Sequence, residues 1–510
     1  MTALSQLPDH QAATLRRRAT GPWLMLVILL GGQFMALLDV TIVNVAMPDI
    51  GRTLHASGAA LQLVVAGYTV SYAMLLITGA RLGALFGRRR LFLAGVALFT
   101  VSSLVCGLAP DAPVLIVARF VQGAGAAAMV PQIISVIQAR FTGATRARAL
   151  SAYSAVLAAG FVCGQVLGGV IVSANLSGMQ WRPVFLVNVP IGLAVLALVP
   201  RVMPAGADVP AAPAPRAGAG ATRPAAHLDL GGLAVAVPAV FLIVLPLVLG
   251  HQEGWPWWTL AAIAAGLVLA AIFVWVERRK AATGGTPLLN LRVLRSPGIV
   301  SGLAAVALTM VAYGGFLFSL SLHMQDGLGY SPLRAGLTFA PCAAAFGLTG
   351  YYWNRLPQRW HQVLTPAGLA LAAVAEVVLG LELRAGTGGG AAFPLVLLVL
   401  GGAMGIGFSP LVTHALAQVP VTDAADASGL LTTTLQLGQV TGVATFGSLF
   451  LTLAGHGRFS LPASPHAIAL TSGWLALLFA AGAAAALPLS RTVIKSRRAV
   501  EPGRGGSAGS

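Results

Sequence analysis

Fourteen separate apolar runs, each about as long as a membrane-spanning helix, dominate this chain of 510 residues. A helix needs roughly 20 apolar residues to cross the hydrocarbon core of a bilayer. The runs therefore predict an all-α polytopic membrane protein. We expect its fourteen helices at 22–46, 58–78, 91–109, 113–137, 148–173, 183–200, 231–250, 257–276, 298–321, 333–352, 364–383, 392–415, 428–453 and 467–489.

The composition agrees with burial in lipid rather than in water. Hydrophobic residues make up 57% of the chain and charged residues 9%, whereas soluble globular domains carry about 25% charged residues. The first 20 residues are polar and lack the pattern of a cleavable signal peptide, so we expect the first span to be retained. All three cysteines, Cys106, Cys163 and Cys342, lie in apolar runs, which favours buried side chains over a disulfide framework or a metal site.

Basic residues fall unevenly on the two sides of the predicted membrane. With an even number of spans both termini share one side, and most of the 31 lysines and arginines lie in the connections on that side. Cytoplasmic connections are enriched in Lys and Arg, so we expect both termini to be cytoplasmic and the protein to lie in the cytoplasmic membrane. The net charge of +17 is then an orientation signal facing anionic lipid, and we expect no nucleic-acid binding. Arg119 lies inside a span, and the opposite side carries Arg52, Arg182, Arg334, Arg384 and Arg458.

Two cytoplasmic connections divide the spans into groups of six, two and six. The connection at 202–226 is rich in proline, alanine and glycine, which is typical of an extended or disordered linker. The connection at 277–297 is charged and then leucine-rich. We therefore predict two six-helix bundles with an inserted pair. The predicted segments are a cytoplasmic tail at 1–21, an N-terminal bundle at 22–200, a linker at 201–230, an accessory pair with its loop at 231–297, a C-terminal bundle at 298–489 and a cytoplasmic tail at 490–510.

Asp39 lies in the middle of the first apolar run, WLMLVILLGGQFMALLDVTIVNVAM at 23–47. A carboxyl group at the centre of a membrane-spanning helix costs about 2.5–3.5 kcal/mol on insertion scales. Residues of this kind usually mark an ion path, a substrate path or a proton relay. Asp39 is therefore the first candidate for a functional residue.

Arg119 is the second charge predicted to lie inside a span. The residues that follow it, FVQGAGAAAMVP, offer no acidic partner, whereas the first span offers Asp39 and Asn44, and Gln122 lies one turn further on the same face. A nearby cation favours the ionised form of a carboxyl group and desolvation favours the protonated form, so movement between two environments makes a proton switch. The alternative is a structural ion pair or an arginine that binds backbone carbonyls.

Further polar residues in the spans are weaker candidates. Glu376, near the middle of the span at 364–383, is a candidate second protonation or cation-binding site. Residues that could line a substrate cavity, or could equally form ordinary hydrogen bonds between helices, are Asn44, Gln62, Tyr68, Tyr72, Gln122, Gln436 and Gln439.

Glycines at four-residue spacing occupy one face of the fifth span. Gly160, Gly164 and Gly168 lie on this face and Gly169 widens it, which lets a neighbouring backbone approach closely. Static packing and a sliding or hinging role remain equally open. The turn ITGARLGALFGRRR after the second span, with Gly79, Gly87, Arg88 and Arg89, is weakly repeated as LTGYYWNRLPQRW after the tenth.

Enzyme and ATP-driven functions find no support in the sequence. It contains no phosphate-binding P-loop, no His/Cys metal spacing and no nucleophile elbow. We therefore expect that the protein is not an enzyme and binds no cofactor. We expect an ion gradient to supply the energy for transport.

Several runs together resemble one family of membrane transporters. They are LDVTIVNVAMP at 38–48, RFVQGAGAAAMVP at 119–131, GQVLGG at 164–169, WRPVFLVNVPIG at 181–192 and the basic turn GARLGALFGRRR. In this order they resemble the fourteen-helix drug:proton antiporter branch of the major facilitator superfamily. The resemblance implies the major facilitator fold, with Asp39 as the membrane-embedded acid, Arg119 as the arginine linked to proton transfer, and Gly164, Gly168 and Gly169 as the antiporter motif.

Two departures from the family pattern stand out. The basic turn has Ala84 where the family has an acidic residue thought to latch the cytoplasmic gate, and Leu85 where it has a basic one. The fifth span has Gln165 where the family has proline. Because a proline inside a helix removes a hydrogen bond and kinks the helix, Gln165 predicts a straighter helix or an added polar group in the cavity.

The resemblance implies a proton-coupled antiporter that exports hydrophobic or cationic drugs by alternating access, working as a monomer with protons and a small molecule as its partners. The alternative on the same fold is a dedicated exporter of one natural product or metabolite. A membrane sensor or scaffold and an importer remain further alternatives. A membrane-embedded enzyme would need polar groups clustered at one depth, and the sequence shows none.

Overall fold

The computed structural model describes residues 9–175, 178–203, 230–250, 254–283, 291–384, 390, 392–417, 419, 424–455 and 463–500. Within these ranges the chain is almost entirely helical, and each of the fourteen expected spans coincides with one helix or with consecutive helical segments. Most of the predicted linker and residues 501–510 lie outside the described residues. Eleven helices of the described chain are long and apolar enough to cross a membrane, and α5 and α8 contribute shorter apolar stretches.

The first six expected spans form the N-terminal bundle. Its helices are α1 (Asp9–Leu54), α2 (Gly58–Phe86), α3 (Arg88–Leu108), α4 (Ala112–Arg140), α5 (Gly143–Ala174), α6 (Pro183–Leu186) and α7 (Asn188–Val202). The sixth span was predicted as one helix at 183–200 but is divided into α6 and α7. Pro190 explains the division, because it has no backbone N–H to donate to the carbonyl of Leu186.

The remaining spans form the accessory pair and the C-terminal bundle. The pair is α8 (Leu230–Leu249) and α9 (Trp257–Ala282). The C-terminal bundle contains α10 (Ile299–Leu322), η3 (His323–Gly327), α11 (Pro332–Tyr352), α12 (His361–Arg384), α13 (Ala392–Ala417), α14 (Ala424–Gly442), η6 (Val443–Gly447), α15 (Ser448–Ala454) and α16 (Ser464–Val500). The short 3₁₀ segments η2 (Leu291–Arg295) and η4 (Trp353–Arg355) precede α10 and follow α11, whereas η3 and η6 are single π-helical turns.

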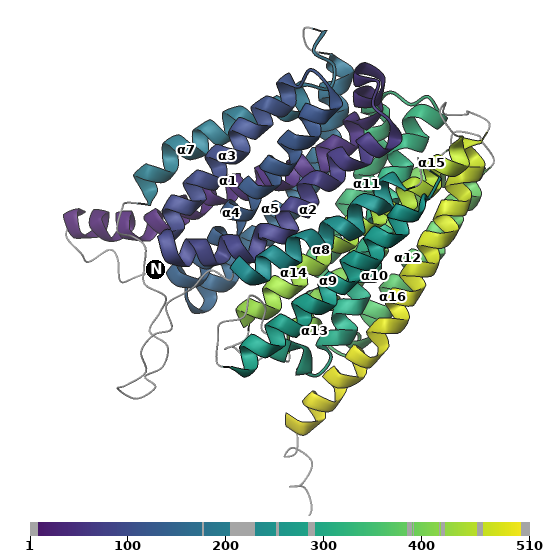
Figure 1. Cartoon of the computed structure of the whole chain (residues 1–510). Coiled ribbons are helices and arrows are strands. Elements are labelled where there is room, and N and C mark those ends of the chain that lie inside the picture. The colour runs from purple at the N-terminus through teal and green to yellow at the C-terminus, as the bar shows by residue number, and fades with distance from the viewer. Residues whose placement is uncertain are drawn as a thin grey trace, which may run out of the picture.

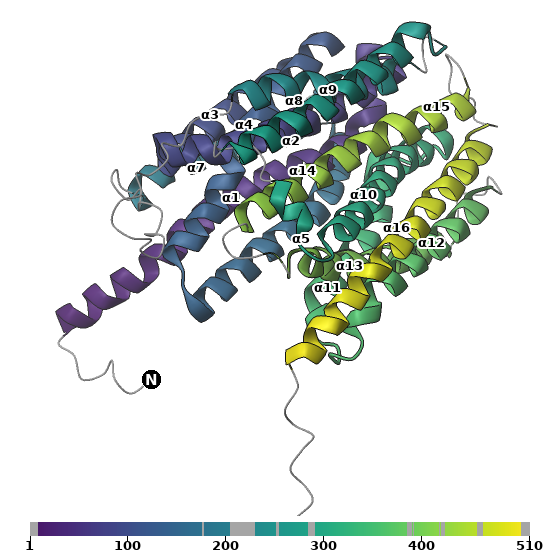
Figure 2. The ribbon, with the colours of Figure 1, turned by 60° about the horizontal axis from the view of Figure 1, so that its bottom comes forward.

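The two bundles lie side by side, the N-terminal one in purple to blue and the C-terminal one in green to yellow (Figure 1). Their most extensive contacts pair α5 with α11, α2 with α14 and α1 with α10, and α1 also contacts α11 while α2 also contacts η6 and α15. The start of α1 and the end of α16 project from the same side of the molecule (Figure 2). We call that side the proximal end, and we call the opposite side, with the α1–α2 and α10–α11 connections, the distal end.

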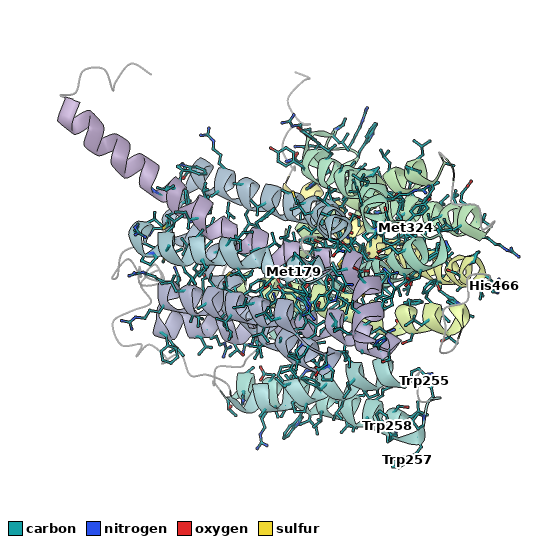
Figure 3. The ribbon with its side chains drawn as sticks, turned by 90° about the horizontal axis from the view of Figure 1, so that it is seen from above. Met179, Trp255, Trp257, Trp258, Met324 and His466 are labelled. Atoms are coloured by element: carbon teal, nitrogen blue, oxygen red, sulfur yellow. The ribbon has the colours of Figure 1, made fainter. Side chains whose placement is uncertain are left out.

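The accessory pair packs on the outside of the seam between α2 and α14. Figure 2 shows α8 and α9 along the outer face of α2 and α4. Val244 of α8 is buried in an apolar cluster with Val70 of α2 and Val440 of α14, and Phe120 stacks on Phe241 at 5.4 Å. The turn between α8 and α9 carries Trp255, Trp257 and Trp258 at one corner of the molecule (Figure 3), a placement typical of residues at a membrane–water interface.

Small residues set the distance between neighbouring helices. A Cβ atom added to Gly95 of α3 would come within 2.7 Å of the Met129 backbone of α4, and one added to Gly368 of α12 would meet the Gly407 backbone of α13 at 2.5 Å. Helices approach this closely only where side chains are absent. Apolar burial drives little association inside a bilayer, so such contacts are a principal source of packing energy here.

Candidate functional site

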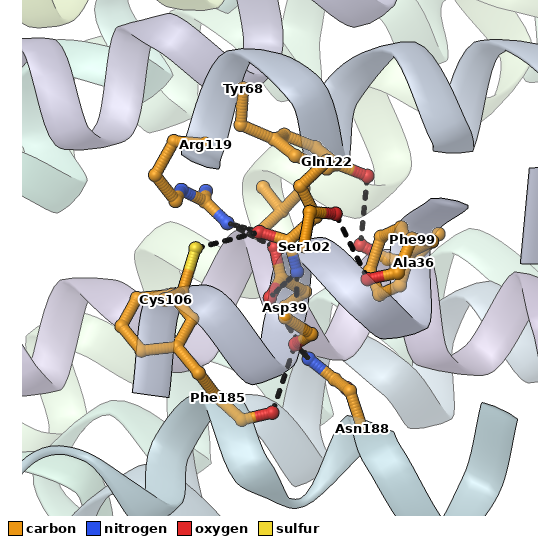
Figure 4. A network of polar contacts seen from close by, with 12 residues as sticks. Ala36, Asp39, Tyr68, Phe99, Ser102, Cys106, Arg119, Gln122, Phe185 and Asn188 are labelled. Carbon is orange, nitrogen blue, oxygen red and sulfur yellow. Dashed lines mark hydrogen bonds and ion pairs between the residues drawn. The ribbon is translucent and has the colours of Figure 1, made fainter. Parts of the chain in front are cut away.

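A buried ion pair joins α1 to α4 in the interior of the N-terminal bundle. Arg119 Nη1 donates to Asp39 Oδ2, and the two side chains are 1% and 0% exposed. The other carboxylate oxygen, Oδ1, accepts from Gln122 Nε2 at 2.8 Å and from Asn188 Nδ2 at 3.0 Å. Asp39 is thus held by donors from two helices besides its own (Figure 4).

A second layer of contacts fixes these donors. Ser103 of α3 accepts from Gln122 Nε2 at 3.1 Å and from Asn188 Nδ2 at 3.0 Å, and donates to the Phe185 carbonyl at 2.9 Å. Arg119 Nε donates to the Val64 carbonyl of α2 at 2.9 Å. We call Asp39, Ser103, Arg119, Gln122 and Asn188 the Asp39 network.

Tyr68 of α2 covers the guanidinium group. The Cζ atom of Arg119 lies 4.6 Å from the centre of the Tyr68 ring and 5.6 Å from that of Phe185. The Tyr68 hydroxyl donates to the Ala36 carbonyl at 3.3 Å, and Tyr72 stacks on Tyr68 at 6.1 Å. An arginine between two aromatic rings keeps cation–π contacts without water.

Asp39 and Arg119 compensate each other's charge in the interior of the bundle. Opposite charges in a low-dielectric interior are tolerated only while each compensates the other. A proton bound to Asp39 removes the charge that holds Arg119 Nη1 and leaves the guanidinium bonded to Val64 and Gln122 alone. The contacts between Asp39 and the donors of α4 therefore depend on the negative charge of the carboxylate.

The sequence predicted part of this network. Asp39, Arg119 and Gln122 were expected to lie together, and the structure brings them into hydrogen-bond contact. Asn44, expected as a second possible partner of Arg119, instead donates to the carbonyls of its own helix at Val40 and Thr41. Its place is explained by helix geometry, because a residue five positions beyond Asp39 lies on a different face of α1.

Ser103 and Asn188 were missed by sequence reasoning. Both are polar residues in otherwise apolar spans, and Asn188 lies inside the motif WRPVFLVNVPIG that carried the family resemblance. A search of the spans for buried amides as well as charges would have found Asn188. Its Oδ1 atom has no hydrogen-bond partner among the described residues, which leaves one free acceptor beside the ion pair.

Polar contacts also join the two bundles at the distal end. Ser321 Oγ of α10 donates to the Asn44 carbonyl at 2.6 Å, and Gln325 Nε2 of η3 donates to the Val45 carbonyl at 3.0 Å. On the other flank Gln62 Nε2 of α2 donates to Ser448 Oγ of α15 at 3.1 Å. These contacts close the distal end around the axis between the bundles.

An exposed ion pair and a backbone contact add to this closure. Arg52 of α1 pairs with Asp326 of η3 at 3.4 Å and with Asp49 of its own helix at 2.7 Å. The Leu333 N–H of α11 donates to Ser173 Oγ of α5 at 2.8 Å. Polar contacts near this end thus join α1 to α10 and η3, α2 to α15, and α5 to α11.

The glycines of α5 face two different neighbours. Cβ atoms added to Gly160, Gly164 and Gly168 would meet Leu37, Thr41 and Ile42 of α1, whereas one added to Gly169 would lie 2.6 Å from the Pro332 carbonyl of α11. The predicted glycine face thus packs α5 against α1 inside one bundle, and Gly169 packs it against the other bundle.

Gln165, which stands where the family has proline, lies between these glycines. Its side chain is buried, and neither polar atom has a hydrogen-bond partner among the described residues. Gln436 and Gln439 of α14 are half-buried. These three predicted cavity residues are not in contact with the Asp39 network in the part of the chain that the structure describes.

The basic turn between α2 and α3 lies at the proximal end of the N-terminal bundle and contacts α4. Gly87 has a φ of 95°, a conformation that favours glycine, and Arg88 Nη1 donates to the Ser135 carbonyl of α4 at 3.2 Å. Gly79 packs against the Ala127 backbone, and its carbonyl accepts from Gln132 Nε2 at 2.9 Å. Arg89 is half-buried beside Arg88.

Glu376 lies apart from all these contacts. It belongs to the C-terminal bundle, where Oε1 accepts from Ser472 Oγ of α16 at 3.2 Å. No group of three or more His, Cys, Asp or Glu side chains that could hold a metal ion occurs in the described ranges, and the three cysteines are free thiols.

The model of the Major Facilitator Superfamily matches residues 29–443, which is most of the chain. The chain belongs to the Major Facilitator Superfamily. The predicted family is therefore confirmed, and the protein is a membrane transporter and not an enzyme.

Curated relatives of this transporter include exporters of antibiotics and drugs. It is 35% identical over 439 residues to the probable actinorhodin transporter of Streptomyces coelicolor, covering 85% of this chain and 73% of that protein. It is 37% identical to the cephamycin export protein CmcT of Amycolatopsis lactamdurans, with 86% of each chain covered. It is 33% identical to the multidrug resistance protein Stp of Mycobacterium tuberculosis, covering 82% and 74%.

Solved structures share the fold of this transporter at low sequence identity. A bacterial homologue of the human lysosomal transporter Spinster, solved in an inward-facing and unoccupied conformation, matches with a TM-score of 0.62 at 17% identity over 93% of this chain and 98% of that one. An auto-inhibited POT family peptide transporter matches with a TM-score of 0.64 at 15% identity, covering 92% and 96%. The expected architecture of two six-helix bundles with an inserted pair is the architecture observed.

Proposed function

We propose that this transporter is a proton-coupled antiporter that exports hydrophobic or cationic small molecules by alternating access. The observation that carries the proposal is the buried Asp39–Arg119 pair, a titratable group inside the membrane-spanning part of the N-terminal bundle. Ionisable residues inside membrane spans are rare and usually mark an ion path, a substrate path or a proton relay, which supports a functional role for Asp39. The transporter needs no bound cofactor in this scheme, because the proton gradient supplies the energy.

The mechanism depends on the exchange of partners at Asp39. In the described state the carboxylate is held by Arg119, Gln122 and Asn188. Proton binding weakens these three contacts together, since all of them depend on the negative charge. Because the donors come from α4 and α7 while Asp39 belongs to α1, their release allows these helices to shift relative to one another.

We also propose an orientation in which the distal end faces outward and both termini are cytoplasmic. The excess of basic residues in the proximal connections supports it. The polar contacts between the bundles at the distal end then support a state closed toward the outside. In this scheme the protein works as a monomer in the cytoplasmic membrane, and its basic surface faces anionic lipid rather than nucleic acid.

The identity of the relatives favours a second candidate on the same fold, a dedicated exporter of one natural product. The match to the cephamycin export protein CmcT covers 86% of this chain and 86% of that protein. Accumulation assays on a susceptible strain, run with a panel of toxic compounds with and without an uncoupler, separate the two. A broad resistance profile supports multidrug export, and protection against one compound class supports the dedicated exporter.

The central test replaces the acid with its uncharged amide. Asp39→Asn is expected to insert and fold but to lose proton-driven efflux in inverted membrane vesicles. The matched control is Asp111→Asn, because Asp111 is an exposed residue that caps α4 through the Val114 N–H at 2.9 Å and asparagine caps helices equally well. Full proton-driven efflux by Asp39→Asn, at the level of the control, would remove Asp39 from the mechanism.

A further inference from the structure

Glu376 of α12 is a buried carboxyl group with a single hydrogen-bond partner among the described residues. Its side chain is 1% exposed. Oε1 accepts one hydrogen bond, from Ser472 Oγ of α16 at 3.2 Å, and Oε2 has no partner among the described residues. Among the residues that the structure describes, no Lys, Arg or His side chain forms an ion pair with Glu376, whereas Asp39, Asp49 and Asp326 each pair with an arginine.

The contrast with Asp39 lies within the same molecule. Both acids are fully buried in membrane-spanning bundles. Asp39 receives a guanidinium group and two amide donors, whereas Glu376 receives a single hydroxyl. The two acids are equally buried, but only Asp39 has a cation beside it. The surroundings of Asp39 therefore favour the ionised carboxylate, and those of Glu376 favour the neutral acid.

Glu376 lies in the interface between α12 and α16, and this interface is tightly packed. A Cβ atom added to Gly380, one turn further along α12, would lie 2.9 Å from Ser472 Cβ and 3.2 Å from the Ala469 carbonyl. Leu379 of α12 and Leu475 of α16 are also buried. The Cys342 thiol of α11 interacts electrostatically with Glu376, and this thiol is buried as well and carries no positive charge.

We propose that Glu376 holds its own proton as a neutral carboxylic acid, separately from the Asp39 network. An isolated ionised carboxylate in an apolar medium is so unfavourable that such a group neutralises instead. With the proton bound, the carboxyl group and Ser472 form a neutral hydrogen bond between α12 and α16. Glu376 is thus a second proton-binding site, and the proposal does not depend on whether Asp39 couples transport.

Infrared spectroscopy of the purified protein in lipid tests the protonation state directly. At neutral pH the wild type is expected to show the carbonyl band of a protonated carboxyl group, and Glu376→Gln to lack it. Asp39→Asn and Glu382→Gln, the latter on the same helix near its end, are expected to keep the band. Ser472→Ala, which removes the hydrogen-bond partner, is expected to shift the band without abolishing it.

Two spectroscopic results would overturn the proposal. One is a wild-type spectrum without the band. The other is a Glu376→Gln spectrum identical to that of the wild type. Both readouts are independent of transport, so they distinguish failure of this proposal from failure of the proposed antiport.

Discussion

Closure of the distal end depends on two kinds of contact whose strengths can be compared. Gln62 and Ser448 are 1% and 5% exposed and bond to each other at 3.1 Å. Arg52 and Asp326 approach to 3.4 Å, but their side chains are 60% and 25% exposed. Hydrogen bonds between transmembrane helices average about 0.6 kcal/mol and reach about 1.7, whereas an exposed ion pair contributes roughly 0–1 kcal/mol and is screened by salt.

These magnitudes predict different responses to substitution. Gln62→Leu keeps the side-chain volume but removes the hydrogen bond, so the ratio of open to closed distal ends is expected to rise by roughly three- to twentyfold, with no dependence on salt. Arg52→Gln is expected to raise the same ratio by at most about fivefold at low ionic strength. That effect is expected to vanish at about 1 M salt, where screening acts over about 3 Å.

The assay measures the separation of the bundles at the distal end. Spin labels are attached to cysteines at Pro110 and Ala392, which are exposed at the start of α4 and of α13, in a background without the native cysteines. Pulsed electron paramagnetic resonance then gives the populations of short and long distances. The control is Gln358→Leu, the same substitution at an exposed position between α11 and α12.

A reversed order would refute this reasoning. If Arg52→Gln opened the distal end more than Gln62→Leu, or if salt abolished the effect of Gln62→Leu, the buried hydrogen bond would not be the stronger contact. A response of the Gln358→Leu control equal to that of Gln62→Leu would show that the change is not specific to the interface.

Two further predictions concern Asn188 and Gly169. Asn188→Leu removes one donor from Asp39 Oδ1 and one from Ser103. Because a hydrogen bond to a charged group contributes about 1.5–3 kcal/mol, we expect at least a tenfold loss of efflux rate and a lower melting temperature in detergent. An unchanged efflux rate and melting temperature would show that Asn188 does not support Asp39. Gly169→Leu places a side chain against the Pro332 backbone, so we expect the spin-label distances to shift toward the open population with folding preserved, whereas collapse of the protein yield would identify the contact as purely structural.

The fold was largely predictable from the sequence because lipid offers no hydrogen-bond partners to the backbone of a membrane-spanning segment. Each span must satisfy its backbone hydrogen bonds internally, so a run of about 20 apolar residues becomes a helix whatever its partners. All fourteen runs follow this rule. Helix ends were less predictable: α1 begins at Asp9 and α16 continues to Val500, because polar residues beyond the membrane also form helix.

The candidate site was predictable where charge marked it. Asp39 and Arg119 are conspicuous in apolar runs, and each needs the other. Ser103 and Asn188 were not predictable in the same way, because a hydroxyl or amide in a span also occurs in ordinary packing. The place of Glu376, in a seam of the C-terminal bundle and away from Asp39, depends on the packing of α12 on α16, which no local pattern specifies.

The π-helical turn η6 gives the contact between Gln62 and Ser448 a particular vulnerability. A π-turn contains one residue more than an α-turn, and Ser448 follows it directly. At 3.6 residues per turn, loss of that extra residue from the turn would rotate everything beyond it by about 100°. A change from π- to α-helical winding, with no unfolding of the helix, is therefore enough to turn the Ser448 hydroxyl away from Gln62 and break the polar contact between α2 and α15.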